Sequence, residues 1–200
     1  SLDSVVSRLK TLSFRELDKF QVDGLKPKAV FVPETIEEVA EVVMKAGEVG
    51  AAVTPWGGGT MMSLGGVPKK MDIVLSLKNL NRVIEYLPED LVVTTEAGMT
   101  LENLQAVLAE KNQFLALDPP YASVATLGGI VACNSFGPIR YVYGGVKDLL
   151  LGVRVANSNG SLTRFGGRVV KNVAGYDIRK LYVGSLGTLG VIVHTTFKLH

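Results

Sequence analysis

The sequence has one cysteine, two histidines and no apolar run long enough to cross a bilayer, and each scarcity excludes a class of protein. Cys133 alone cannot form an internal disulfide or a multi-thiolate metal site, and its small apolar neighbours favour burial. The two histidines, His194 and His200, do not make a metal site with ligand spacing. No basic segment followed by an apolar one stands at the start, so we expect no signal peptide, no membrane insertion and a cytoplasmic protein.

Charge of neither sign dominates the chain. In 200 residues, 21 Lys and Arg balance 19 Asp and Glu, which leaves a net charge of +2. The basic residues are scattered, so the sequence lacks the electrostatic footprint of a nucleic-acid-binding protein. Hydrophobic residues make up 47% of the chain and charged residues 20%, which excludes a disordered protein and is ordinary for a folded enzyme-sized domain.

Apolar periodicity predicts two lobes after a helical lead-in over residues 1–24. In the first lobe, about residues 25–88, Thr35 and Glu38 form a capping-box pattern that begins a helix. A glycine-rich loop follows the strand after that helix, and ligands are expected at that place in a strand–helix–strand unit. The strands expected in this lobe cover residues 29–32, 51–53, 72–77 and 82–87.

The second lobe, about residues 89–200, contains helices begun at Thr100 and Thr126 and an Asn159-Gly160 hairpin signal. Its expected strands cover residues 91–95, 148–156, 161–165 and 191–199. The crossovers are too few for a regular doubly wound fold. We therefore predict an α+β fold, with a small parallel βαβ lobe and a larger mixed or antiparallel lobe.

Three consecutive glycines, residues 57–59, separate the first-lobe strand from Thr60. Glycine costs backbone entropy in an ordered structure, so three together indicate a close approach of bare backbone to something. Successive N–H groups in such a loop form an anion nest, which suits a diphosphate. Thr126 is expected at a second anion-favouring place, the start of a short helix where N–H groups are unpaired. The alternative for the glycine loop is a flexible surface turn.

Side chains for acid–base or nucleophilic chemistry do not form any visible motif. The sequence lacks the GxGxxG fingerprint, the phosphate-binding P-loop and a serine nucleophile motif. His194, on the last expected strand, is more typical of a structural histidine than a catalytic one. Glycine clusters at Gly128, Gly144, Gly166 and Gly184 are spread along the chain, so several loops could converge on one long ligand. The chemistry would then come from a cofactor.

Five ordered stretches resemble the FAD-binding domain of the vanillyl-alcohol oxidase and p-cresol methylhydroxylase (PCMH-type) flavoprotein family over about residues 25–199. They are residues 32–39, residues 55–60, residues 127–129 with Asn134, Gly144 with Asp148, and residues 184–192. Within that family, residues 165–177 are most similar to the E-type FAD-binding subunit of bacterial glycolate oxidase. The resemblance implies that FAD lies in the cleft between the two lobes.

The resemblance also implies which residues bind the cofactor. At the diphosphate these are Pro55, Trp56, Gly57, Gly58, Gly59, Thr60 and Met61; on the flavin and ribityl side Pro119, Thr126, Leu127, Gly128, Gly129, Ala132, Asn134 and Gly137; at the adenine end Gly190, Val191 and Ile192; and further motif positions are Gly144 and Asp148. For Gly128 and Gly129 the alternative is close helix packing, and for Ile192 a place in the core. Some relatives attach FAD covalently through a histidine in the glycine loop. Here that loop has no histidine and Cys133 is a poor tether, so non-covalent FAD is expected.

The implied function is that of an FAD-binding subunit or domain of a flavin-dependent oxidoreductase, a glycolate or other 2-hydroxy-acid dehydrogenase. Hydride would pass from the substrate to FAD, and electrons would leave through a second flavoprotein and an iron–sulfur subunit. Family members continue into a substrate domain, and this chain stops at His200, so we expect that domain to be absent and name no catalytic residue. Two alternatives stay open: an FAD-binding structural or electron-relay subunit without a substrate site, and a nicotinamide-using reductase on the same fold.

Overall fold

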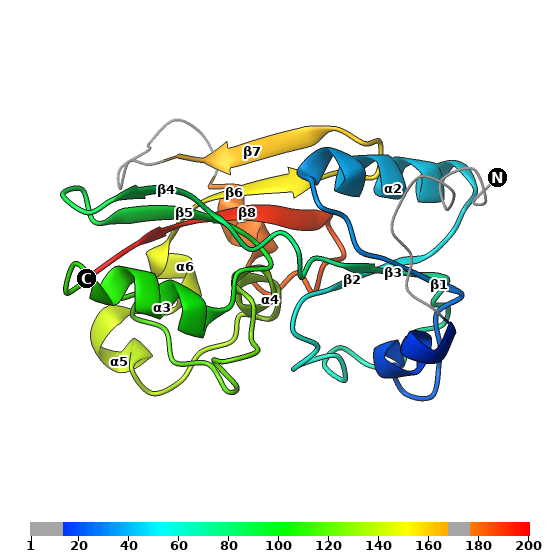
Figure 1. Cartoon of the computed structure of the whole chain (residues 1–200), viewed down its shortest axis with the longest axis horizontal. Coiled ribbons are helices and arrows are strands. Elements are labelled where there is room, and N and C mark those ends of the chain that lie inside the picture. The colour runs from blue at the N-terminus through cyan, green and yellow to red at the C-terminus, as the bar shows by residue number, and fades with distance from the viewer. Residues whose placement is uncertain (1–13, 168–176) are drawn as a thin grey trace.

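The computed structural model describes residues 14–167 and 177–200, and it shows an α+β fold built on two sheets (Figure 1). The smaller sheet is parallel, with strand order β1-β3-β2, and consists of β1 (Ala29–Phe31), β2 (Val53–Trp56) and β3 (Ile73–Ser76). The larger sheet is antiparallel, with order β4-β5-β8-β6-β7, and consists of β4 (Val83–Leu87), β5 (Val92–Glu96), β6 (Leu150–Ala156), β7 (Leu162–Gly166) and β8 (Val191–Lys198). The predicted fold class is confirmed.

Helices surround the two sheets on different faces. They are the 3-10 helix η1 (Phe14–Phe20) and the helices α2 (Ile36–Glu48), α3 (Leu101–Ala109), α4 (Leu127–Cys133), α5 (Arg140–Tyr143), α6 (Val146–Leu149) and α7 (Arg179–Tyr182). Figure 1 shows α3, α4, α5 and α6 gathered on one face of the larger sheet. Most of the predicted helical lead-in lies outside the described residues, and its described part forms η1 and a short bridge between Val22 and Leu25. Within the described residues, no helix has the length and apolar character that a bilayer span requires.

Helix α2 begins where the sequence places its cap. The Thr35 hydroxyl accepts a hydrogen bond from Glu38 N at 3.2 Å, while the Glu38 carboxylate reaches back one residue further than expected, to Glu34 N at 2.7 Å. Two orphan donors at the helix start are thereby satisfied. The apolar stripe of α2 is buried, with Val39 fully inaccessible, so the helix ties the parallel sheet to the larger sheet.

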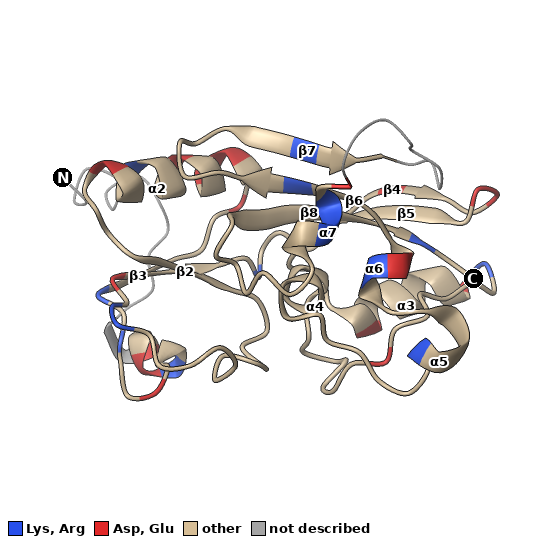
Figure 2. Ribbon diagram, turned by 180° about the vertical axis from the view of Figure 1, so that it is seen from behind, with Lys and Arg blue, Asp and Glu red and all other residues tan. Residues whose placement is uncertain are grey.

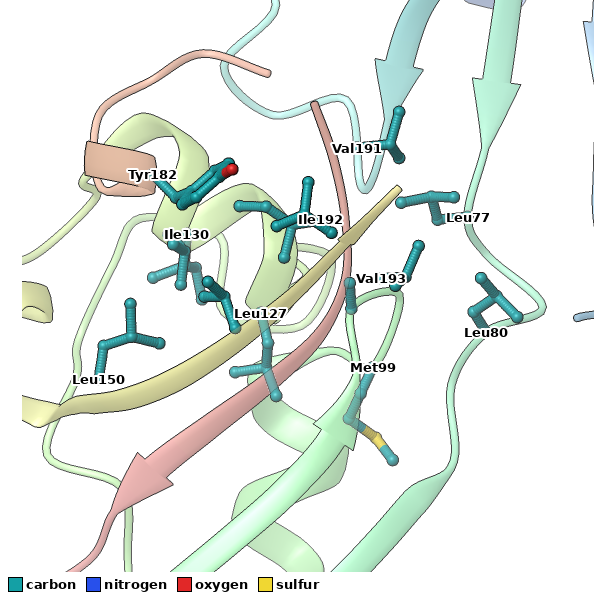
Figure 3. Close-up of a cluster of buried hydrophobic side chains, with 14 of the residues drawn as sticks. Leu77, Leu80, Met99, Leu127, Ile130, Leu150, Tyr182, Val191, Ile192 and Val193 are labelled. Atoms are coloured by element: carbon teal, nitrogen blue, oxygen red, sulfur yellow. The ribbon is translucent and has the colours of Figure 1, made fainter. Parts of the chain in front are cut away.

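One hydrophobic core extends across both sheets. On one face of the parallel sheet, Phe31 and Leu75 belong to the same buried cluster as Leu104 of α3 and Phe197 of β8. The other face of that sheet has a separate small cluster, which η1 covers through Leu17. In the larger layer, the side chains of α4 lie in the core with those of β6 and β8 (Figure 3). The parallel sheet is therefore buried on both faces, as its apolar β3 sequence requires.

Two predicted strands of the first lobe differ from those observed. Residues 83–87, expected in the first lobe, form β4 and pair antiparallel with β5. A tight connection closed by Leu91 N donating to Pro88 O joins these strands, and such a connection favours hairpin pairing. Sheet membership thus changes between β3 and β4, ahead of the boundary suggested near residue 88. The strand expected at residues 51–53 runs instead from Val53 to Trp56, and Pro55 is tolerated because β2 is an edge strand.

Candidate cofactor site

A single groove collects residues from three separated segments of the chain. It encloses about 940 Å³ of atom-free space, part of which is open to solvent. Residues 54–64 follow the course of β2 into the glycine loop, residues 125–135 contain α4, and residues 186–192 lead into β8. Leu77, just beyond β3, and Ala97, just beyond β5, complete the lining. The groove therefore lies where the carboxyl ends of parallel strands meet the larger sheet, the expected place for a ligand.

Many residues that the resemblance assigns to the cofactor do line this groove. They are Pro55, Trp56, Gly57, Gly58, Gly59, Thr60, Met61, Thr126, Gly128, Gly129, Ala132, Gly190 and Ile192. The assigned residues that do not line it are Pro119, Leu127, Asn134, Gly137, Gly144, Asp148 and Val191. Lining residues that were not assigned to the cofactor are Thr54, Met62, Leu64, Leu77, Ala97, Ala125, Ile130, Cys133, Ser135, Leu186 and Gly187.

The glycine loop presents consecutive backbone donors that no protein group uses. Within the described part of the chain, no atom accepts a hydrogen bond from the N–H groups of residues 57–61. The ladder between β2 and β3 ends just before them, where Leu77 N donates to Trp56 O at 2.9 Å. Backbone donors in folded proteins normally have partners. A run of five without one, along a groove, is suited to an oxygen-rich anion.

Protein contacts also explain all three loop glycines. A Cβ on Gly57 would collide with the Thr126 side chain, and one on Gly58 with the carbonyl oxygen of Val124. Gly59 adopts a φ of +70°, and its Cβ would lie 2.8 Å from Nε1 of Trp56. The loop therefore packs tightly against the segment before α4. The lack of side chains at residues 57–59 permits this packing and also leaves N–H groups accessible to a ligand.

Helix α4 begins at the groove, but its first N–H groups are already paired. Thr126 Oγ1 accepts from Gly129 N at 3.4 Å, Leu127 N donates to Met99 O at 2.8 Å, and Gly128 N donates to Ala97 O at 2.8 Å. The expectation of unpaired donors at this helix start is wrong. The turn after β5 uses them to anchor α4, and a Cβ on Gly128 would lie 2.7 Å from the Cβ of Ala97.

An ion pair between the exposed Arg82 side chain and the buried Glu96 carboxylate fixes the turn that carries Ala97. Glu96, whose side chain is 1% exposed, accepts from Arg82 Nη2 at 2.8 Å on Oε1, and from Arg82 Nε at 3.2 Å and Arg82 N at 2.8 Å on Oε2. Burial opposes the charged form and raises the pKa of Glu96, but the hydrogen bonds from Arg82 outweigh burial and lower it. Ala97 N then donates to Val193 O at 2.9 Å, so the groove floor is tied to β8.

The segment 184–190 closes the groove from the end of α4. Leu186 N donates to Ala132 O at 2.9 Å, which satisfies one of the orphan carbonyls at the helix C-terminus. Gly187 has a φ of +75°, and a Cβ there would lie 3.2 Å from Cγ of Pro55. The third segment therefore touches both α4 and β2, and it holds the two sides of the groove together.

Several assigned residues outside the groove have local structural roles. Asn134 is the C-cap of α4 in the left-handed conformation, with φ 50° and ψ 46°. Gly137 packs so closely on Asp118 that a Cβ would collide with its backbone oxygen. Pro119 and Val191 are buried without lining the groove. Cofactor roles for these residues stay predictions.

The Gly144 and Asp148 pair belongs to a helix start. Asp148 Oδ2 accepts from Gly145 N at 2.8 Å, which caps α6, and Gly144 has a φ of +86°. The strand expected from residue 148 consequently begins only at Leu150, because Asp148 lies within α6. Of the glycolate-oxidase-like stretch at residues 165–177, residues 168–176 lie outside the described part of the chain.

Cys133 is half-buried and lines the groove instead of lying in the core. Burial raises the pKa of its thiol, so it remains protonated at neutral pH. Among the described residues that line the groove, none is Asp, Glu, His, Lys or Arg. The groove can therefore bind through backbone donors, hydroxyls and apolar surface, and it offers no side chain from this lining for proton transfer.

The fold and the groove define an α+β domain with a long groove that is lined by glycine turns. A protein-family comparison agrees: the family described as "FAD binding domain" matches residues 27–166. The chain therefore belongs to this family of FAD-binding domains.

Curated relatives are similar to this chain over part of their own length. Glycolate oxidase subunit GlcD of Bacillus subtilis is 35% identical over 174 residues, which cover 86% of this chain and 37% of that protein. D-2-hydroxyglutarate dehydrogenase of Xanthomonas citri is 36% identical over 174 residues, with the same shares. Glycolate oxidase subunit GlcE of Escherichia coli is 44% identical over 118 residues, 58% of this chain and 34% of that protein. The chain thus spans about a third of the length of these relatives.

Solved structures share the fold. An alkyldihydroxyacetonephosphate synthase structure superposes with a TM-score of 0.77 at 23% sequence identity, covering 98% of this chain and 36% of that one. A second crystal form of the same enzyme gives a TM-score of 0.76. At this identity the likeness concerns the fold alone.

Proposed function

We propose that this chain is the FAD-binding part of a flavin-dependent 2-hydroxy-acid dehydrogenase of the glycolate oxidase type. Membership of the FAD-binding domain family supports the cofactor. The names of its relatives, which include two glycolate oxidase subunits and a D-2-hydroxyglutarate dehydrogenase, support the substrate class. Since two of them are subunits by name, a second flavoprotein and an iron–sulfur subunit are the proposed partners.

The observation that carries this proposal is the run of unpartnered N–H groups at residues 57–61 along an otherwise uncharged groove. Residues 57–61 fit a diphosphate, because backbone donors stabilise phosphate oxygens without a counter-cation. The apolar side chains of Leu77, Ile130 and Ile192 fit aromatic rings. We propose that residues 126–132 hold the flavin and ribityl side and that residues 190–192 hold the adenine end.

Bound FAD would supply the redox chemistry, accepting a hydride from the hydroxyl-bearing carbon of the acid. The residues of this chain bind and orient: the glycine loop holds the diphosphate, while the Arg82–Glu96 pair fixes the turn that positions α4. The glycine loop contains no histidine and Cys133 remains a thiol, so the attachment is proposed to be non-covalent.

A second function has an observation in its favour. The described lining of the groove has no ionisable acid or base other than a Cys133 thiol of raised pKa. A protein that only binds FAD, as a structural or electron-relay subunit, needs no such group. The two proposals differ in whether substrate reduces the bound flavin.

The test begins with FAD titration of the purified chain, followed by flavin fluorescence. Tight binding is expected, with the yellow colour released to the supernatant on acid precipitation. Gly58→Ala is expected to weaken binding strongly, whereas the control Gly167→Ala, whose Cβ would meet no atom of the described residues within 4 Å, is expected to bind normally. Colourless protein that refuses FAD would refute the proposal, and colour in the pellet would refute non-covalent attachment.

The reaction is tested anaerobically on the FAD complex. Bleaching of the flavin absorbance by glycolate or another 2-hydroxy acid supports the dehydrogenase. Flavin that stays oxidised with these acids, but is bleached when the proposed partner subunits are added with glycolate, supports the electron-relay alternative.

A further inference from the structure

A row of basic side chains crosses the larger sheet on the face turned away from the cofactor groove. Arg164 of β7 lies directly opposite Arg154 of β6, and Arg154 lies opposite His194 of β8. Figure 2 shows the basic positions on β6 and β7. This row lies in a second hollow, with about 940 Å³ of atom-free space, lined by Ile84, Glu85, Thr94, Val153, Arg154, Leu162, Arg164, His194 and Thr196.

The row is electrostatically unfavourable by itself. Like charges directly opposite on neighbouring strands destabilise a sheet. Neither Arg154 nor Arg164 forms an ion pair or hydrogen bond with any described residue. The next residue in the row, Glu96 of β5, is already engaged by Arg82. The cluster therefore retains uncompensated positive charge in a hollow.

Other charged groups face the same place without cancelling it. Glu85 of β4 lines the hollow, and the carboxylate of Glu37 on α2 acts on His194 at longer range. Burial first, and then the charge of Arg154, lowers the pKa of His194 despite the opposing charges of Glu96 and Glu37.

We propose that this hollow is a binding site for a small dianionic oxyanion, either a phosphate group or a dicarboxylate. Side chains directly opposite on antiparallel strands start about 5 Å apart at Cβ, so two guanidinium groups can grip one oxyanion. His194 beside them offers a ring nitrogen as a further hydrogen-bond partner, and the two guanidinium charges favour a dianion over a monoanion. Thr94 and Thr196 are buried and bonded to each other at 2.9 Å, so they form the floor. The site is independent of FAD binding.

The test is a nuclear magnetic resonance titration of the full chain, in which the arginine Nε–H signals and the histidine ring signals are followed. Inorganic phosphate and succinate are added separately, against sodium chloride at matched ionic strength. If the Arg154 and Arg164 signals shift saturably with phosphate alone, the site binds a tetrahedral oxyanion. If they shift with succinate alone, it binds a dicarboxylate. If they shift with both, it is a general site for dianions. Shifts no larger than with chloride overturn the proposal. Saturation by polyglutamate without response to either small anion overturns it too, and assigns the face to an acidic partner.

Variants separate binding from folding. Replacing both arginines, R154Q with R164Q, is expected to weaken anion binding about tenfold, because charge-assisted hydrogen bonds are lost. The control Lys111→Gln removes one exposed charge elsewhere and is expected to change nothing. Relief of repulsion means that the double variant should not melt below the wild type. A lower melting temperature with unchanged phosphate titration would make the arginines structural and overturn the site.

Discussion

Replacing Glu96 with glutamine is expected to loosen the groove, although Glu96 does not line it. The carboxylate of Glu96 is 1% exposed and accepts three hydrogen bonds from Arg82, whereas the amide that replaces it has one acceptor oxygen and carries no charge. Hydrogen bonds that involve a charged group contribute about 1.5–3 kcal/mol, so Glu96→Gln should lower the free energy of unfolding by about 2 kcal/mol at neutral pH. Urea unfolding measures this directly, with the exposed Glu41→Gln as a matched control.

The stability difference between wild type and Glu96→Gln is expected to depend on pH, and the lowered pKa of Glu96 gives the direction of that dependence. Because the folded-state pKa of Glu96 is lowered from the ordinary value of 4.5, the ion pair adds stability above that pH and loses it as the pH falls through the folded pKa. The stability gap between wild type and Glu96→Gln is therefore widest at neutral pH and narrows below pH 4.5. A stability gap that is constant with pH, or absent, would refute the assignment of a stabilising Arg82–Glu96 pair.

The same variant should weaken FAD binding. Glu96 precedes Ala97, whose carbonyl accepts from Gly128 N at the start of α4, so a relaxed turn misplaces one wall of the groove. A fluorescence titration should show a higher dissociation constant for Glu96→Gln and an unchanged one for Glu41→Gln. An unchanged value for both would show that α4 is held without the ion pair.

Three further outcomes are expected. Leu127→Ala, at a fully buried α4 position, should lower the free energy of unfolding by about 2–5 kcal/mol, as measured in urea. Gly58→Ala should lower the melting temperature as well as FAD affinity, since its Cβ would collide with Val124 O; an unshifted melting curve would contradict this tight packing. Asp72→Asn should destabilise by about 1–3 kcal/mol, because the buried carboxylate accepts from Ala52 N at 2.9 Å and pairs with Lys28 and Lys70. Hydrogen bonds from Lys28 and Lys70 hold the pKa of Asp72 far below its ordinary value of 3.8, so in urea unfolding this loss should be full at neutral pH and should shrink as the pH falls below 3.8.

The elements that the sequence predicted well are those specified by local chemistry. Thr35 caps α2 because a hydroxyl and a carboxylate three residues apart satisfy neighbouring donors, whatever the rest of the chain does. The hairpin at Asn159-Gly160 joins β6 to β7 because its turn requires positive φ, which Gly160 adopts at +79°. Which sheet a strand joins is not specified by local chemistry. Nothing within residues 83–87 shows that β5, and not the parallel sheet, supplies the hydrogen bonds.

The candidate site was predictable where glycine signals a close approach and unpredictable where the partner is distant in sequence. The glycines of residues 57–59 were found, but their contact with residues 124–126 involves a segment more than 60 positions away. The pairing of the first α4 donors with Met99 and Ala97 is equally non-local. Leu77 could have been found, because it follows β3 at the edge where β2 also ends, and parallel strands place their carboxyl ends together.

The groove depends on both sheets at once, and that dependence explains why its residues are spread so widely. The glycine loop comes from the parallel sheet, α4 is anchored to β5 and packs on β8, and residues 184–190 touch both. None of these segments alone encloses a ligand. Because Gly57 and Gly58 contact residues 124–126, the donors at residues 57–61 are held beside α4 before any cofactor arrives. Such preorganisation lowers the ordering cost of binding, and it suits a groove whose described lining offers bare N–H groups and no basic side chain to an anionic ligand.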